Sequence, residues 1–315
     1  MGICISTASS QIRHETEGSV ICRNELIYEQ NGSICGIQKL DYICSKQGAK
    51  GINQDAAFFY QNYGAENTAL LGVFDGHGKN GHVVSNMVKN RLPLLLIGQI
   101  NERNREEQFV TAFKVMDKEI KLHENLDCWC SGSTAVIAVK EGEDLVIGNL
   151  GDSRAVLGRM GEGGIEAVQL TTDLKPGLPD EGERIRRNNG RVLALKEEPH
   201  IQRVWLPNED APGLAMSRAF GDFALKNHGI IALPDVSHRR LTSDDRFIVL
   251  ATDGIWDVLS NDQVVSIVWE AENEEAAAKA AVEAAAEAWK RYPSSKLDDC
   301  TVVWLFLQNQ AEREN

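Results

Sequence analysis

The sequence predicts an α+β protein in which two antiparallel sheets pack together and helices cover their outer faces. Short apolar runs separated by Gly-, Asp- and Glu-containing turns are typical of strands joined as hairpins. The last run, residues 301–307, is apolar on both alternating faces, so this strand must be covered on both sides. Amphipathic helices also come in pairs, which suits two layers outside two packed sheets.

Composition excludes several functional classes. The chain has 315 residues, enough for one large domain or two ordinary ones. Its net charge of −13 argues against nucleic acid as a partner and is compatible with cation binding, although a solvated acidic surface explains most such charge. The longest aliphatic run is too short to span a membrane. Seven cysteines form neither a disulfide framework nor a zinc pattern, so we expect an intracellular protein with reduced thiols.

The N-terminus carries a possible lipidation signal. Residues 1–35 are polar and mixed after the first few positions, and we expect a mostly flexible extension. Gly2, with a hydroxyl residue at position 6, fits the pattern for myristoylation after removal of Met1, although so short a motif also occurs by chance. Cys4 lies where a second, reversible acyl chain could be added. One myristoyl chain gives only marginal membrane binding, so Cys4 would matter.

One domain is expected over residues 36–310, and its first half should hold seven strands and two helices. Turn-bounded apolar runs predict the strands. Apolar residues at helical spacing predict the helices: Val84, Val88 and Leu92 share one stripe, and Phe109 and Phe113 share another. The expected strands cover residues 37–44, 56–60, 68–74, 133–139, 144–149, 153–158 and 165–170, and the expected helices cover residues 79–96 and 105–124.

The second half begins with a short charged helix over residues 179–189. Residues 190–235 then form an irregular region that holds four of the eight prolines, and a loop this long in a compact domain is more often functional than accidental. The glycine-rich segment 158–164 superficially resembles a nucleotide-binding loop, but no helix start follows it, and we interpret it as a hairpin turn. The remaining expected elements are a strand over residues 247–251, helices over 260–270 and 273–291, and the strand over 301–307.

Residues 69–78 place three chemically useful residues at the end of a buried strand. Asp75 offers a hard oxygen ligand, Gly76 lets the backbone approach an ion closely, and His77 can transfer a proton near neutral pH. On its own, the Asp-Gly pair is equally well explained as a turn. The choice between the two depends on whether other strands also end in acids.

Four expected strands do meet an acid at one end. Antiparallel neighbours bring the end of one strand beside the start of the next, so acids far apart in the chain can share one edge. Clustered carboxylates repel each other unless a cation lies between them, and an all-oxygen ligand set suits magnesium or manganese rather than zinc. The acids concerned are Asp75, Asp152, Asp253 with Asp257 one turn later, and Asp299 beside Asp298.

Apart from Asp298, these acids lie in segments that resemble the metal-dependent type 2C protein serine/threonine phosphatases, the PPM family. The segments occur in the family's order over roughly residues 36–308. Within the family, the chain is most similar to plant members that combine an N-terminal acylation signal with the Gly-Ile-Asn-Gln-Asp form of the first motif. The matching segments are residues 50–55, 73–78, 131–135, 149–155, 217–222, 251–257 and 299–303.

The resemblance implies a four-layer α-β-β-α sandwich that holds two Mg²⁺ or Mn²⁺ ions per subunit in a cleft at one end. Asp75 would bridge both metals, and the Gly76 carbonyl would bind one of them. Asp253 and Asp299 would hold the other, and Asp55 would act partly through water.

Further positions carry over with other roles. Asp152 and Asp257 match positions linked to a weaker third metal. Lys50 stands where many members have an arginine that grips the substrate phosphate, and a lysine pairs with phosphate as a point charge without the bidentate fork. The region 190–235 would be a flap beside the cleft, where substrate choice resides.

The implied activity is hydrolysis of phosphoserine and phosphothreonine in proteins. A water between two cations loses its proton easily and can attack phosphorus in line. His77 would protonate the departing oxygen as general acid, and no phosphoenzyme is expected. Departures from the family pattern include Gln54, which replaces an acid of some members, and Cys300, which replaces a frequent asparagine beside Asp299. None removes a core ligand, so the alternative of a catalytically silent phosphoprotein-binding regulator is disfavoured.

The partners implied are phosphoprotein substrates and protein kinases, with a membrane surface contacted through the acylated N-terminus and no nucleic acid. We expect a monomer in the cytoplasm with plasma-membrane anchoring, and the sequence also allows a nuclear location.

Overall fold

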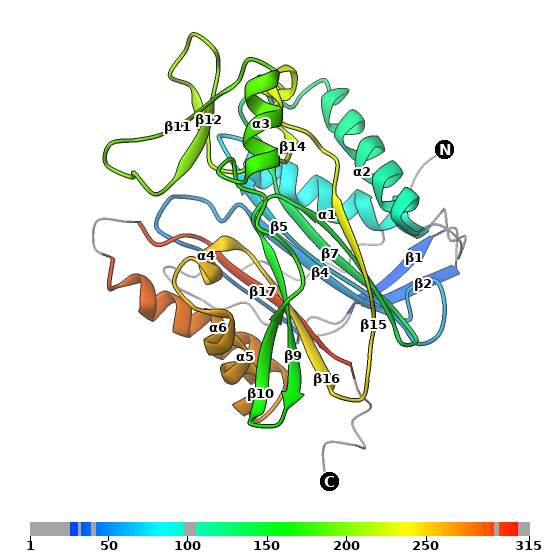
Figure 1. Ribbon diagram of the computed structural model, residues 1–315. Coiled ribbons are helices and arrows are strands. Elements are labelled where there is room, and N and C mark those ends of the chain that lie inside the picture. The colour runs from blue at the N-terminus through cyan, green and yellow to red at the C-terminus, as the bar shows by residue number, and fades with distance from the viewer. Residues whose placement is uncertain (1–25, 31–32, 39–41, 98–104, 293–295, 308–315) are drawn as a thin grey trace.

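The computed structural model describes residues 26–30, 33–38, 42–97, 105–292 and 296–307. Two antiparallel sheets pack face to face, and a pair of helices lies on the outer face of each sheet (Figure 1). Three separate apolar clusters fill the spaces between these four layers. The predicted α-β-β-α sandwich is confirmed.

The larger sheet has nine strands in the described part of the chain, and its main path runs β1-β2-β4-β5-β7-β8-β15. Two short strands add to this sheet at the end of β5: β6 pairs with the last two residues of β5, and β14 pairs with β6. The strands are β1 (Leu26–Gln30), β2 (Ser33–Gln38), β4 (Asp55–Gln61), β5 (Thr68–His77), β6 (Gly132–Ser133), β7 (Ala135–Glu141), β8 (Asp144–Leu150), β14 (Phe220–Gly221) and β15 (Asp235–Arg240).

The second sheet has five strands in the order β10-β9-β16-β17-β3. Its central strands are buried on both faces, as the sequence of the last strand predicts. Val302 and Trp304 pack towards the outer helices, whereas Val303 packs between the sheets. The strands are β3 (Ile43–Lys46), β9 (Arg154–Gly161), β10 (Gly164–Gln169), β16 (Asp245–Ala251) and β17 (Cys300–Phe306).

The outer helices bury one apolar stripe each. Helices α1 (Gly81–Ile97) and α2 (Arg105–Lys121) cover the larger sheet, and α2 buries Phe109, Phe113 and Met116 against it. Helices α5 (Asn261–Glu270) and α6 (Glu274–Trp289) cover the smaller sheet. Ser260 caps α5 in a capping box and Asn273 caps α6, so one free amide in the first turn of each helix, that of Gln263 and that of Ala276, is satisfied.

The region predicted to be irregular contains a small sheet of its own. Strands β11 (Arg191–Ala194), β12 (Gln202–Trp205) and β13 (Pro212–Leu214) pair in that order, and α3 (Pro179–Arg187) packs beside them around Ile185 and Val204. From here on we use the name flap for this unit, residues 179–214, which starts and ends earlier than the predicted region 190–235. Its strands have three or four residues each, too short to show a period in the sequence.

Other differences from the expected elements are local. The single strand expected over residues 37–44 is two strands, β2 and β3, which belong to different sheets. The hairpin β1–β2 begins at Leu26, within the stretch assigned to the extension. A four-residue helix, α4 (Asp253–Trp256), follows β16, and a 3₁₀ turn spans Lys226–His228. Within the described residues, no helix is long and apolar enough to cross a membrane.

Candidate active site

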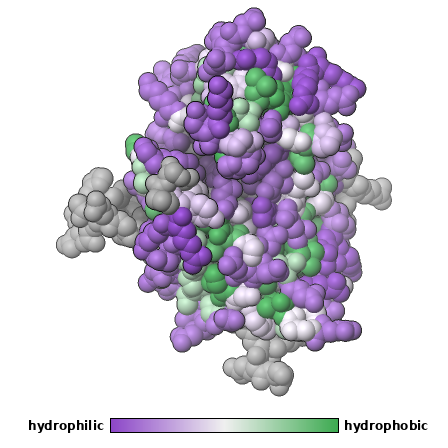
Figure 2. All heavy atoms as spheres, turned by 60° about the vertical axis from the view of Figure 1, so that its left-hand side comes forward, coloured by the Kyte–Doolittle hydropathy of each residue, from purple (hydrophilic) through white to green (hydrophobic). Residues whose placement is uncertain are grey.

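The predicted acidic residues come together where β4, β5, β16 and β17 end or begin. Asp55 lies directly opposite Asp75 in the β4–β5 ladder, and Ala251 lies opposite Val302 in the β16–β17 ladder. The residues that follow β16 and precede β17 therefore meet at the same end of the sandwich. This end faces the flap, on the left-hand side of Figure 1. Figure 2 brings that side forward and shows mostly hydrophilic residues around a hollow between the upper and lower parts of this face.

Asp75 and Asp253 form the centre of the acid cluster, where the charge of Asp253 acts directly on Asp75. Burial raises the pKa of both well above the ordinary value. Neighbouring negative charges raise these pKa values further. The charges of Asp253 and Asp55 act on Asp75, and the charges of Asp152 and Asp257 act on Asp253. Two carboxyls so close cannot both ionise without a counter-charge, so this pair would share a proton or hold a cation.

Asp55 lies opposite Asp75, at the start of β4. Its side chain is buried, and Oδ2 accepts a hydrogen bond from the Thr252 hydroxyl at 2.8 Å. Burial raises the pKa of Asp55 to about 7, with a further contribution from Asp299 and Asp298. The hydrogen bonds of Thr301 and Thr252 oppose this rise.

Asp298 and Asp299 have different surroundings. Both carboxylate oxygens of Asp299 accept main-chain amides, from Gly48 at 2.7 Å and from Gln54 at 2.8 Å. Asp298 instead pairs with the ammonium of Lys50, and its charge raises the pKa values of Asp75 and Asp253. Asp299 thus holds the loop that carries Lys50, whereas Asp298 faces the acid cluster.

The resemblance gives the ligand role to Asp299 and none to Asp298. Two adjacent acids before a strand were the only signal available, and the spacing alone does not decide which of them faces the cluster. Asp299 is held by two main-chain amides of the loop that carries Lys50, whereas the charge of Asp298 acts on both Asp75 and Asp253, so Asp298 is the better candidate for a metal ligand.

The two residues linked to a third metal lie around a lysine. The Nζ atom of Lys175 is 3.7 Å from Asp152 Oδ2 and 3.8 Å from Asp257 Oδ1. Burial tends to lower the pKa of Lys175, but the charges of Asp152 and Asp257 outweigh this and raise it. Sequence reasoning missed Lys175, which lies in a segment without a recognised role.

His77 ends β5 and binds a carboxylate from another part of the chain. Its Nε2 atom lies 2.6 Å from Asp222 Oδ2, and the Asp222 side chain is almost fully buried. Burial disfavours the charged imidazole, but the charge and hydrogen bond of Asp222 outweigh this and raise the pKa of His77. A histidine held in this way is suited to carry a proton near neutral pH.

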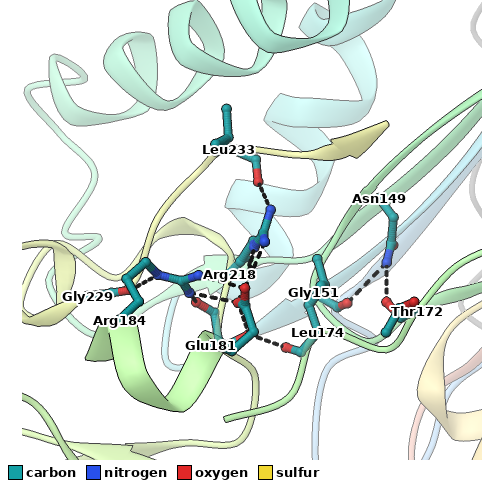
Figure 3. A network of polar contacts seen from close by, with 10 residues as sticks. Asn149, Gly151, Thr172, Leu174, Glu181, Arg184, Arg218, Gly229 and Leu233 are labelled. Atoms are coloured by element: carbon teal, nitrogen blue, oxygen red, sulfur yellow. Dashed lines mark hydrogen bonds and ion pairs between the residues drawn. The ribbon is translucent and has the colours of Figure 1, made fainter. Parts of the chain in front are cut away.

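The base of the flap is fixed by a buried carboxylate. Glu181 of α3 binds the guanidinium groups of Arg184 and Arg218 and accepts a hydrogen bond from the Ser217 hydroxyl (Figure 3). Arg218 also donates to the Leu233 carbonyl at 2.9 Å. Burial raises the pKa of Glu181, but the hydrogen bonds from Arg184 and Arg218 outweigh it and lower the pKa to about 2. The network ties α3 to residues 217–233, the segment that also carries Asp222.

The donor set suits a hard divalent cation. Within the described residues, no three His, Cys, Asp or Glu side chains form a ready-made metal centre. However, one carboxylate oxygen each of Asp55, Asp152 and Asp253 is buried without a hydrogen-bond partner in that part of the chain. Such orphaned oxygens are costly unless a cation or water satisfies them, and carboxylates are the ligands that Mg²⁺ and Mn²⁺ prefer.

A four-layer sandwich with an acid cluster at one end of its sheets defines a class of phosphatase fold. A family model described as "Protein phosphatase 2C" matches residues 42–295. The chain therefore belongs to the protein phosphatase 2C family, and it is a protein phosphatase whose substrates are phosphoproteins.

Individual relatives agree with this assignment. The chain is 53% identical to "Probable protein phosphatase 2C 72" of Arabidopsis thaliana, with 99% of each chain covered. It is 50% identical to "Probable protein phosphatase 2C 64" of Oryza sativa subsp. japonica, over 86% of this chain and 66% of the relative. Among solved structures, a serine-threonine phosphatase 2C from Toxoplasma gondii superposes with a TM-score of 0.76 at 27% identity, covering 92% of this chain and 99% of that one.

Proposed function

We propose that the protein hydrolyses phosphoserine and phosphothreonine in proteins and depends on Mg²⁺ or Mn²⁺. The observation that carries the proposal is the cluster of Asp75, Asp253 and Asp298 beside His77, with orphaned carboxylate oxygens around it. Such a cluster needs positive charge, and a phosphate monoester brings two further negative charges to the same place.

Two cations would be held by this chain. Asp75 would contact both, the Gly76 carbonyl and Asp55 would support one, and Asp253 with Asp298 would hold the other. A weaker third cation would lie near Asp152 and Asp257. When bound, the cations supply a water of lowered pKa and positive charge for the phosphoryl oxygens.

The protein's own groups would bind the phosphate and move the proton. Lys50 is half-exposed beside the cluster and would pair with a phosphoryl oxygen. As the oxygen of water bonds to phosphorus, the bond to the serine or threonine oxygen breaks and His77 gives that oxygen its proton. The products are the free hydroxyl side chain and inorganic phosphate. His77 is reprotonated from solvent, which receives the proton lost by the attacking water.

A phosphoenzyme is not expected. Cys300 lies beside the cluster, and burial together with the charge of Asp55 raises the pKa of its thiol, so it is not a thiolate at neutral pH. Its Sγ atom lies 3.3 Å from the Gly254 carbonyl oxygen, which it can bind as a weak donor.

A direct assay tests the proposal. The wild-type enzyme should release phosphate from a phosphothreonine peptide with manganese and lose this activity with chelator. Asp75→Ala and Asp253→Ala should be inactive while remaining folded by circular dichroism. Equal turnover in all these conditions would contradict the proposal. Phosphopeptide binding without turnover in wild type would instead support a silent regulator.

We also propose that acylation of Gly2 and Cys4 anchors the protein to the plasma membrane from the cytoplasm. Both residues lie outside the described residues, so the sequence pattern is the support for this proposal. The monomeric state and a link to protein kinases are expectations of the same kind.

A further inference from the structure

We propose that Asp222 is the positioning residue of His77: it holds the imidazole through Nε2 and leaves Nδ1 for proton transfer to the leaving group. The inference deepens the proposed function and rests on it, because it takes His77 to be the general acid. Three features position Asp222 against His77: the strand register at the end of β5, the absence of a side chain at Gly132, and the hydrogen bonds that hold the backbone of Asp222.

The end of β5 and two short strands align the two residues. At the end of β5, His77 lies opposite Gly132 of β6, and Gly132 lies opposite Gly221 of β14. Asp222 is the next residue after Gly221. The ladder therefore brings residue 222 back across β6 to residue 77, and the 2.6 Å contact between Asp222 Oδ2 and His77 Nε2 passes over Gly132.

Gly132 leaves the space through which the two side chains meet. A Cβ atom at position 132 would lie 2.4 Å from Asp222 Oδ2 and 2.8 Å from His77 Nε2. It would also lie 2.2 Å from the Phe220 carbonyl oxygen. No residue with a side chain fits there without moving one of these groups, so glycine at this position is coupled to the contact between His77 and Asp222.

Asp222 itself is held in a demanding conformation. Its φ angle is 50°, in the left-handed region that Asp and Asn tolerate better than most residues. Its amide donates to the Ser131 carbonyl at 2.9 Å, and its own carbonyl accepts from the Leu225 amide at 2.9 Å. The preceding amide, of Gly221, donates to Asp117 Oδ1 at 2.9 Å. A buried carboxylate in a strained and cross-braced backbone is suited to hold one orientation.

The contact leaves one nitrogen of His77 for chemistry. When a carboxylate fixes one ring nitrogen, the tautomer and orientation of the imidazole are set and the other nitrogen can exchange a proton. Nδ1 of His77 is buried and has no hydrogen-bond partner within the described residues. Nδ1 is thus the nitrogen left for proton exchange, while the contact with Asp222 fixes the orientation of the ring.

The test compares leaving groups. General acid catalysis matters when the departing oxygen is a poor leaving group and matters little when it is a good one. With saturating manganese, Asp222→Asn should lower kcat about 10–100-fold on a phosphothreonine peptide and on phenyl phosphate. On 2,4-dinitrophenyl phosphate the loss should be within about threefold, and KM should change little. Asparagine keeps the size of the side chain and tolerates the positive φ angle.

Two companion variants separate the possible failures. His77→Asn should show the same or a steeper dependence on the leaving group. Asp245→Asn is the structural control, because Asp245 is also fully buried but lies at the opposite end of β16, where it binds Arg239 and Thr242. It should lose stability without changing the dependence on the leaving group.

The leaving-group dependence of His77→Asn and Asp222→Asn decides between the possible roles. A steep dependence for both His77→Asn and Asp222→Asn supports the inference. A steep dependence for His77→Asn with equal losses on all substrates for Asp222→Asn overturns the positioning role and leaves the proposed function standing. No dependence for His77→Asn overturns the acid role, and the inference with it. An independent check is the ¹⁵N spectrum of histidine-labelled protein, in which the Nε2–H signal of His77 should shift in Asp222→Asn and stay in Asp245→Asn.

Discussion

Asp298 and Asp299 are neighbours in the chain, yet their carboxylates have different partners and different roles. Asp299 accepts the amides of Gly48 and Gln54 through both oxygens, while Asp298 pairs with Lys50 and faces Asp253. Asp299 therefore holds the loop that carries Lys50, the lysine proposed to bind phosphate. Asp298 contributes charge to the site where the cations are proposed to bind.

Substitutions at the two positions should separate these tasks. Asp298→Asn should lower manganese-dependent activity about a hundredfold or more, because a charged ligand is lost. Its thermal stability in chelator should hold or rise, since the acid cluster loses a charge. Asp299→Asn places an amide group against a main-chain donor and should cost on the order of 2–3 kcal/mol of stability. Chemical denaturation and phosphopeptide kinetics measure both. An activity loss confined to Asp299→Asn would return the ligand role to Asp299.

The layers of this fold could be predicted because each leaves a strong periodic pattern. The stripe of Phe109 and Phe113 predicts α2, and the alternation around Trp304 predicts a strand covered on both faces. The flap sheet could not be predicted in the same way. Its strands are three or four residues long, and its core forms from contacts with α3 and with residues after β13 that no local pattern records.

The part of the site that lies at strand ends could be predicted from the sequence. Asp75 and Asp55 meet because their strands are adjacent, and acids at strand ends are visible in the sequence. Asp222 and Lys175 reach the site from loops, and loop paths are set by tertiary contacts rather than by period. The choice between Asp298 and Asp299 depends on which way one peptide turns, and a single sequence does not contain that information.

Lys175 should compete with a cation at the Asp152–Asp257 pair, because its ammonium lies within 3.8 Å of both carboxylates. Lys175→Met should therefore tighten the weakest manganese site about threefold to tenfold, a gain on the order of 1 kcal/mol from the removed charge. The chelated protein should melt at a lower temperature than wild type, and manganese should raise its melting temperature by a larger increment. Isothermal titration calorimetry measures the affinity. A weaker third site in Lys175→Met would show that the lysine helps the cation instead.

The Glu181 network should be the main anchor of the flap. Glu181→Gln leaves Arg184 and Arg218 without their buried counter-charge, which typically costs about 3–5 kcal/mol. Limited proteolysis should then cut residues 190–214 faster than in wild type. Glu183→Gln on the same helix is the control, because its pair with Arg187 is solvent-exposed and should contribute less than about 1 kcal/mol. Equal effects of the two substitutions would rule out a special role for Glu181.

Membrane attachment should depend on both N-terminal positions. Gly2→Ala should remove a myristoyl group from the intact mass and release the protein to the soluble fraction. Cys4→Ser should leave the myristoyl mass in place but weaken partitioning, because one chain binds membranes with a constant of only about 10⁴ M⁻¹. Mass spectrometry and cell fractionation check both variants. Unchanged mass and partitioning in Gly2→Ala would disprove acylation at this site.

The acid cluster should make the chelated protein less stable as the pH rises. The pKa of Asp55 is raised from 3.8 to about 7 in the folded protein, so the protonated form is favoured by folding. Its contribution is fully present below about pH 4 and is lost as the pH rises through about 7. Asp55 alone would contribute up to about 4 kcal/mol over this window. Thermal melts in chelator should therefore show a falling melting temperature between pH 4.5 and 8.

Asp55→Asn should flatten this profile, because asparagine does not titrate and keeps the acceptor for the Thr252 hydroxyl. Manganese should reverse the trend in wild type, since ionised carboxylates bind the cation and protonated ones do not. Asp144→Asn provides a matched control: Asp144 is partly exposed and binds Arg240 at the far end of β8. Its profile in chelator should keep the wild-type slope. A wild-type slope that persists in Asp55→Asn would assign the titration to Asp75 and Asp253, whose raised pKa values act on stability in the same direction.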